Sequence, residues 1–162
     1  MKGVNVHVIC VGKLKEKFYA EAAAEYVKRL GGYCKLRLTE LPEERLPQNP
    51  SRAQIDAALE REGAAIRGKL PAGAAVVALC VEGELLSSEA LADRLARWTA
   101  GGAGTLAFVI GSSHGLHPSV KALARLRLSM SPMTFPHHLA RVMLLEQLYR
   151  CFKIEEGSGY HK

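Results

Sequence analysis

The sequence TLAFVIGSSHGLHPSV, residues 105–120, has the pattern of a strand that leads into a loop. Its β-branched and aromatic residues, Phe108 to Ile110, favour a buried strand that ends at Gly111. A short polar loop follows and closes at Gly115. By itself a glycine-rich loop is more often a tight turn than a site, so its meaning depends on what lies beside it.

A second strand and loop follow in KALARLRLSMSPMTFPHHLARVMLLEQLYRCFKI, residues 121–154. Leu126–Met130 has the pattern of a short strand, and two prolines restrict the loop Ser131–Pro136. The segment His138–Lys153 predicts an apolar helix, because apolar side chains recur at helical spacing. These side chains are Leu139, Val142, Met143, Leu145, Tyr149 and Phe152. Two strand ends that each lead into a rigid loop predict a crevice between the loops.

The rest of the chain alternates strands with helices. The expected strands are Val4–Val11, Cys34–Leu41 and Ala74–Val81, the last ending in a turn at Glu82 and Gly83; the expected helices are Phe18–Leu30, Ser51 to about Gly68, and Ser87 or Ser88 to Trp98. Ser51 and Gln54 have capping-box spacing. The alternation predicts an α/β fold, a mostly parallel sheet with helices on both faces. A length of 162 residues fits a single domain, residues 1–162.

Composition favours a cytoplasmic protein. No apolar run approaches the ~20 residues needed to cross a bilayer, and no secretory signal precedes the first strand. The four cysteines are widely spaced and form no metal-binding motif, which indicates free thiols in a reducing compartment. Cys10 and Cys80 fall in strands expected to be buried, where a thiol acts as a small apolar side chain.

The net charge of +6 is concentrated near the carboxy terminus. Residues 105–162 contain seven Lys or Arg against three acidic residues, and five of the six histidines. Clustered cations attract nucleic-acid phosphates, but a solvated basic surface has the same composition, and charge alone leaves both readings open. If Lys121, Arg125 and Arg127 lie on one surface, that surface would face RNA.

Several segments together resemble one known family. The segments are FVIGSSHGL, LSMSPMTFPHHLARVMLLEQLYRCFKI, the terminal YHK, VICVGKLKEKF, AEYVKRLG and LCVEGELLSSEALA. They resemble the RlmH (YbeA-like) family of SPOUT methyltransferases over essentially the whole chain. The resemblance implies a carboxy-terminal trefoil knot and S-adenosyl-L-methionine as cofactor. It also implies methylation at N3 of a pseudouridine in large-subunit (23S) ribosomal RNA, and a homodimer that acts on ribosomal RNA or the ribosome.

The resemblance also implies the site residues. The cofactor cleft would be lined by Leu79, Gly111, Met130, Ser131, Pro132, Met133, Thr134 and Phe135. The catalytic candidates are His137, Arg141, Tyr160 and His161, with the tail made flexible by Gly157 and Gly159. One departure is Ser112, where the family usually has a second glycine, so its side chain could crowd a cofactor that approaches closely.

The histidines do not predict a metal site. His137 and His138 are adjacent and would point away from each other on a helix, and no carboxylate accompanies them at ligand spacing. His137 and Arg141 are four residues apart, which places an imidazole and a guanidinium on one helical face beside the expected cofactor loop. The alternative interpretation is that His137 caps the helix and that Arg141 lies on the surface.

Two other functions are alternatives to methyl transfer. The loop at Gly111 lacks the GxGxxG pattern of dinucleotide folds and the Lys-Ser/Thr pair of a phosphate-binding loop, which counts against a nucleotide hydrolase. A non-enzymatic ribosome-binding module would use the same basic residues without a cofactor cleft. A separate alternative is that Met130, Met133 and Phe135 are simply core residues. The helix His138–Lys153 is apolar over more of its circumference than a sheet would cover, which predicts a partner subunit against it.

Overall fold

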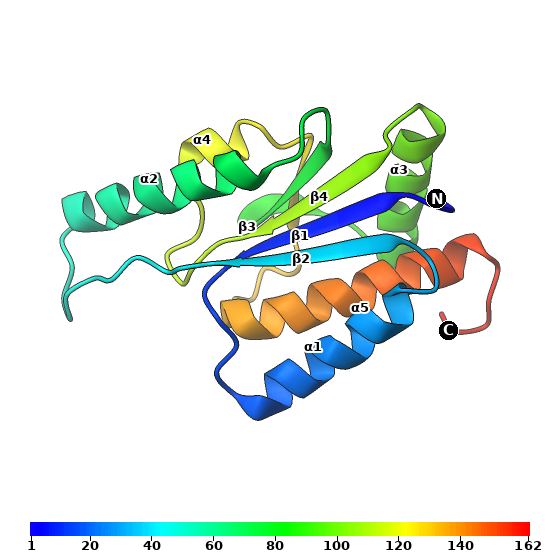
Figure 1. Ribbon diagram of the computed structural model, residues 1–162, viewed down its shortest axis with the longest axis horizontal. Coiled ribbons are helices and arrows are strands. Elements are labelled where there is room, and N and C mark those ends of the chain that lie inside the picture. The colour runs from blue at the N-terminus through cyan, green and yellow to red at the C-terminus, as the bar shows by residue number, and fades with distance from the viewer.

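The computed structural model describes residues 1–162 and has a five-stranded parallel sheet at its centre (Figure 1). The strands run in the order β2-β1-β4-β3-β5, and every pairing is parallel. Their bounds are β1 Asn5–Val11, β2 Lys35–Leu41, β3 Ala75–Leu85, β4 Thr105–Ile110 and β5 Leu126–Ser129. The parallel sheet expected from the alternation of elements is therefore confirmed.

Helices cover both faces of this sheet. Helices α1, α3 and α5 lie on one face, and α2 and the short α4 lie on the other (Figure 1). Their bounds are α1 Lys17–Leu30, α2 Arg52–Lys69, α3 Ser88–Ala100, α4 Pro118–Lys121 and α5 His137–Glu155. The larger core joins β1, β3 and β4 to α1, α3 and α5, and the smaller one joins the opposite face of the same strands to α2 and α4.

The expected helix starts are confirmed in detail. Ser51 accepts a hydrogen bond from the Gln54 amide, and the Gln54 side chain accepts one from the Ser51 amide, so the capping box is complete. Ser87, rather than Ser88, caps α3. Each element lies within a few residues of its expected bounds.

The turn expected at Glu82 and Gly83 is wrong. Strand β3 continues to Leu85 and pairs with β5 on both sides of an irregularity, with a register shift between Leu79 and Glu84. A Cβ atom at Gly83 would lie 2.8 Å from the backbone of Arg127 in β5. Glycine is therefore needed here because β5 approaches the bulged segment closely, not because the chain turns.

The wide apolar surface of α5 has an explanation within the chain. The helix packs against the sheet and lies between α1 and α3, so three neighbours cover it (Figure 1). Leu144, Leu145 and Leu148 are fully buried, and the Tyr149 ring packs edge-on against Tyr33. The apolar circumference is thus no evidence for a partner, and the homodimer stays a prediction of the resemblance. The trefoil knot likewise stays a prediction.

The cysteines are all free thiols. Cys10, Cys34 and Cys151 are buried, and burial raises the pKa of the Cys10 thiol to about 11. Cys80 is only partly buried, because it lies in the irregular part of β3, so its expected burial is wrong. No helix in the structure combines the length and apolarity that a membrane span requires.

Candidate functional site

A cavity of about 500 Å³ lies beside the irregular part of β3 and the ends of β4 and β5. Its walls are residues 79–82 of β3, residues 110–116 around the loop after β4, and residues 128–137 without Pro132, together with Lys121 and Ala140. The carboxyl edge of a parallel sheet is where such folds bind ligands, because successive loops diverge there. The crevice expected between the two loops is therefore present. Of the eight residues expected to bind a cofactor, all but Pro132 line it.

Gly111 is fixed by the way its loop closes. The Gly115 amide donates to the Ser112 carbonyl at 2.9 Å, and Gly115 has a φ of +88° that favours glycine. This closure brings the Gly115 carbonyl against Gly111, where a Cβ atom would lie 2.2 Å from the carbonyl oxygen. A side chain at Gly111 is therefore excluded by the loop itself before any ligand is considered.

Ser112 does not leave its side chain free to crowd the cavity. Its hydroxyl donates to Oε1 of Glu62 in α2 at 2.8 Å, and the pair is buried. Oε2 of Glu62 accepts from the Glu44 amide at 2.9 Å. Glu62 is only 5% exposed, and burial raises the pKa of its carboxyl above the usual value. These hydrogen bonds join the loop after β4, helix α2 and the segment at Glu44 on the side of the loop that faces α2.

Glu62 was not identified from the sequence, although a signal existed. Within α2 the buried positions are Ala58, Glu62, Gly63 and Ile66, which recur at helical spacing. A glutamate on the apolar stripe of a helix needs a buried hydrogen-bonding partner. That signal predicts a partner without saying which residue supplies it.

Arg141 does not lie in the cavity beside His137. It is 2% exposed and reaches across the ends of the first two strands, where it pairs with Glu40 and donates to the Gly12 carbonyl at 2.9 Å. It is therefore neither a surface arginine nor a cavity residue. Because Glu40 is in β2 and Gly12 follows β1, Arg141 ties the start of α5 to both strand ends.

His137 does line the cavity, and its ring contacts that of His138. The two ring centroids are 4.1 Å apart, so the expectation that these rings point away from each other is wrong. Both Nε2 atoms are buried without a hydrogen-bond partner. Burial, then the charge of His138, lowers the pKa of His137, which favours a neutral imidazole. No three His, Cys, Asp or Glu side chains are placed to hold one metal ion.

Tyr160 and His161 lie toward the other end of α5. The Tyr160 hydroxyl donates to Glu146 at 3.3 Å, and the Tyr160 ring packs edge-on against Tyr149. His161 bridges two helices, because Nε2 lies 2.7 Å from Glu89 of α3 and Nδ1 lies 3.1 Å from Arg150 of α5. Glu146 lies nine positions after His137 in the helix, which is roughly 14 Å of rise. The four catalytic candidates therefore form no single cluster within one chain.

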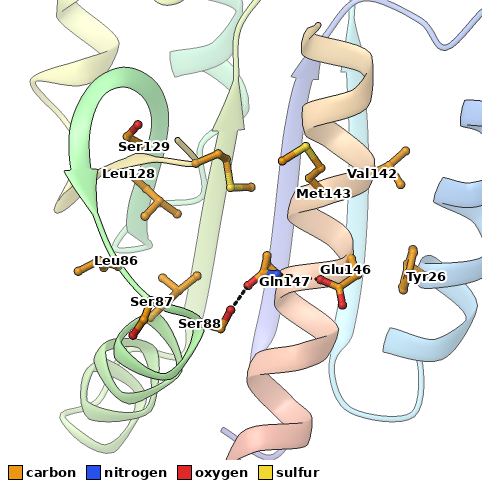
Figure 2. Close-up of a pocket in the computed structure, with 12 residues that line it drawn as sticks. Tyr26, Leu86, Ser87, Ser88, Leu128, Ser129, Val142, Met143, Glu146 and Gln147 are labelled. Carbon is orange, nitrogen blue, oxygen red and sulfur yellow. Dashed lines mark hydrogen bonds between the residues drawn. The ribbon is translucent and has the colours of Figure 1, made fainter. Parts of the chain in front are cut away.

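A second cavity of about 390 Å³ opens between α3 and α5 (Figure 2). It shares Leu128, Ser129 and Met130 with the first cavity, so the end of β5 forms a wall of both. The sequence does not predict any of its polar residues, including Ser88 and Gln147, as site residues. Ser88 and Gln147 are far apart in the sequence and belong to no motif that would have brought them together.

The basic residues expected to face RNA are largely engaged within the chain. Lys121 pairs with Glu82, and Arg127 donates to the Lys121 carbonyl at 3.2 Å. The Arg125 guanidinium lies over the Trp98 ring, 4.7 Å from its centroid. Only Lys121 has an acidic partner, whereas Arg125 and Arg127 are exposed and keep their charge, so a surface that faces RNA stays a prediction.

Comparisons with known proteins agree with this architecture. A solved structure described as that of a probable methylase family protein from Haemophilus influenzae Rd KW20 superimposes with a TM-score of 0.52, covering 99% of this chain and 71% of that one. The sequence identity is 13%, so this likeness concerns the fold alone. Residues 4–161 match the family described as "Predicted SPOUT methyltransferase". Because that match spans nearly the whole sequence, the chain belongs to the SPOUT methyltransferase family.

Proposed function

We propose that this protein uses S-adenosyl-L-methionine to methylate N3 of a pseudouridine in 23S ribosomal RNA, as its resemblance to the RlmH family implies. The observation that carries the proposal is the cavity beside the irregular part of β3 and the ends of β4 and β5, whose walls are the two loops that resemble that family. SPOUT membership supports methyl transfer in general. The nucleotide and the position on it come from the resemblance.

The residues that line this cavity fit the cofactor. The close contact between Gly111 and the Gly115 carbonyl fixes the shape of the loop, and the backbone groups of residues 111–116, which line the cavity, can hydrogen-bond to a ligand. Met133 and Phe135 are 72% and 38% exposed at the cavity, an unusual position for large apolar side chains unless something covers them. When bound, S-adenosyl-L-methionine would supply an electrophilic methyl group.

The acceptor nitrogen must lose its proton, and His137 can take part in that. Its lowered pKa keeps the imidazole neutral near pH 7, so a ring nitrogen is able to accept a hydrogen bond or a proton. Arg141 holds the start of α5 in place and is a positioning residue in this scheme. Tyr160 and His161 would act at the cavity of a second subunit, since within one chain they lie farther along α5.

An exposed basic loop beside the cavity suits an RNA partner. Lys13, Lys15 and Lys17 are exposed in and just after the β1–α1 connection. The loop contacts the start of α5, where a Glu16 oxygen lies 3.6 Å from Nδ1 of His138. Phosphates bound at these lysines would place RNA next to the cofactor loops. We propose this loop as a cationic contact in addition to Lys121, Arg125 and Arg127.

Transfer of labelled methyl groups tests the proposal. Ribosomal particles with and without pseudouridine in the target loop are incubated with the protein and labelled S-adenosyl-L-methionine, and the product is identified by mass spectrometry. Labelled N3-methylpseudouridine should form only in the first set. Equal labelling of both sets would contradict the acceptor assignment. Failure to bind S-adenosylhomocysteine in calorimetry would instead favour a ribosome-binding module without activity.

A further inference from the structure

Three polar side-chain atoms gather at Gly12, where the ends of β1 and β2 meet the start of α5. A Cβ atom at Gly12 would lie 3.5 Å from each of Oε2 of Glu43, Nε2 of His137 and Nε2 of His138. Gly12 has a φ of +99°, and its amide donates to the Leu41 carbonyl at 2.7 Å. Glu43 follows two residues after Leu41, the last residue of β2, so this hydrogen bond brings its carboxylate toward the start of α5.

The two ring nitrogens of His137 have different surroundings. Nε2 is buried without a hydrogen-bond partner and lies 4.0 Å from Oε2 of Glu43. His137 nonetheless lines the cavity proposed for the cofactor, which leaves Nδ1 as the ring nitrogen for a ligand there. In sites where a histidine takes up a proton, one ring nitrogen does the chemistry while a carboxylate orients the other. Glu43 is placed to do the second of these.

The charges around His137 make Glu43 the main group that favours its protonated form. Burial, then a charge on His138, lower the pKa of His137, and Arg141 acts in the same direction. Glu43 and Glu16 raise this pKa, and Glu43 is the stronger of the two. His137 is also the first residue of α5, where the helix dipole disfavours a positive charge. A proton on His137 is therefore opposed by its own helix and stabilised chiefly by Glu43.

Four other titratable side chains line the same cavity, namely Cys80, Glu82, His114 and Lys121. Lys121 pairs with Glu82, and His114 is exposed in the loop after β4. None of the four is among the groups that most affect the pKa of His137. Glu43 does not line the cavity, so its charge can be removed without altering the cavity wall.

We propose that Glu43 is a positioning residue that orients His137 and stabilises the imidazolium formed when His137 takes the proton of the methyl acceptor. This rests on the proposed function, because it concerns the base of the same reaction. The neutral ring carries its hydrogen on Nε2, toward Glu43. The acceptor N–H bond breaks, its proton moves to Nδ1, and its electron pair stays on the nitrogen that receives the methyl group. The charged ring then faces Glu43 at the distance of an ion pair.

The test compares wild type with Glu43→Gln, Glu43→Asp and Glu44→Gln. Glutamine keeps the shape of Glu43 and removes its charge, so a purely structural role would survive the change. Glu44→Gln is the matched control, because the Glu44 side chain pairs with Arg61 instead. The pKa of His137 is measured by NMR on histidine-labelled protein, with the signal assigned by its loss in His137→Asn. Transfer of labelled methyl groups to ribosomal particles is measured across the pH range in which histidine titrates.

Glu43→Gln should lower the pKa of His137, and the acid limb of the pH–rate profile should move to lower pH by the same amount. The plateau rate should fall by roughly tenfold, since general-base catalysis as a whole contributes about 10²–10⁴-fold and Glu43 supplies part of it. Glu43→Asp, which keeps the charge, should recover part of the rate, and Glu44→Gln should match wild type. Affinity for S-adenosylhomocysteine should be unchanged in all forms, because neither glutamate lines the cavity.

An unchanged pKa of His137 in Glu43→Gln would overturn the proposal. A lowered pKa with an unmoved pH–rate profile would overturn it too, because the pairing would then have no part in proton transfer. If wild type transfers no methyl group to ribosomal particles while the pKa of His137 still depends on Glu43, the proposed function fails and the pairing of Glu43 with His137 stands.

Discussion

Replacing Gly111 by alanine tests whether the closed loop after β4 forms the cofactor site. The new Cβ atom would lie 2.2 Å from the Gly115 carbonyl oxygen and 3.0 Å from Cδ2 of Leu116, whereas ordinary contact begins at 3.4 Å. The carbonyl must therefore retreat by roughly 1 Å, and a misplacement of that size at a site can cost about a hundredfold in function. The strand cannot shift instead, because Phe108 and Val109 are fully buried.

Calorimetry with S-adenosylhomocysteine measures the effect on binding, and denaturant unfolding measures the effect on the fold. We expect Gly111→Ala to weaken binding by about a hundredfold, which is about 2.7 kcal/mol. Overpacking of the loop should lower the free energy of unfolding by about 1–3 kcal/mol. The control is Gly104→Ala at the other end of β4, where a Cβ atom would meet nothing within 4 Å. If Gly111→Ala bound as tightly as Gly104→Ala, the loop would not be part of the cofactor site.

Three further predictions concern other parts of the molecule. Burial raises the pKa of Glu62 above 4.5, so the folded state binds its proton more tightly than the unfolded state, and the free energy of unfolding should fall as pH rises through the window above 4.5. Glu62→Gln should flatten this fall in denaturant titrations, and an unchanged pH slope would show that Glu62 is not its cause. Lys13→Gln with Lys15→Gln should reduce the salt dependence of binding to ribosomal particles, by a slope of roughly 0.7 to 0.9 per lysine, without changing cofactor affinity. Gly111→Val and a chain truncated after Ser158 should each be inactive, and their mixture should regain activity if one subunit's tail completes its partner's site; proven heterodimers without activity would contradict this.

Local signals predicted the element order and the first cavity. The alternation of apolar runs with helical spacing follows from burial on one or two faces, and Gly111 and the prolines 132 and 136 mark loop positions without reference to distant residues. Glu82 and Gly83 have the composition of a turn, so local signals predict a turn where β3 has a bulge. The reason for Gly83 is instead the approach of Arg127, a contact across more than forty residues that spacing within β3 cannot reveal.

The candidate catalytic residues show a similar limit. The spacing of His137 and Arg141 correctly predicts one helical face, but a face does not say what lies against it. The Arg141 side chain does not line the cavity and instead contacts Glu40 and the Gly12 carbonyl. The rings of His137 and His138 come together because both Nε2 atoms lie near Gly12, which distance along the sequence does not reveal. Such arrangements depend on rotamers chosen by tertiary packing.

Ser112 shows how two residues that each look unfavourable can fit together. In a glycine-rich loop a serine side chain is an obstruction, and on the buried stripe of α2 a glutamate is an unsatisfied charge. The hydrogen bond between them removes both problems, because it turns the hydroxyl toward α2 and gives the carboxylate a donor besides the Glu44 amide. Removing the hydroxyl by Ser112→Ala should therefore destabilise the fold by about 1–3 kcal/mol. A glycine at this position would be equally costly while Glu62 remains, so the departure from the usual second glycine is coupled to the glutamate fifty residues earlier.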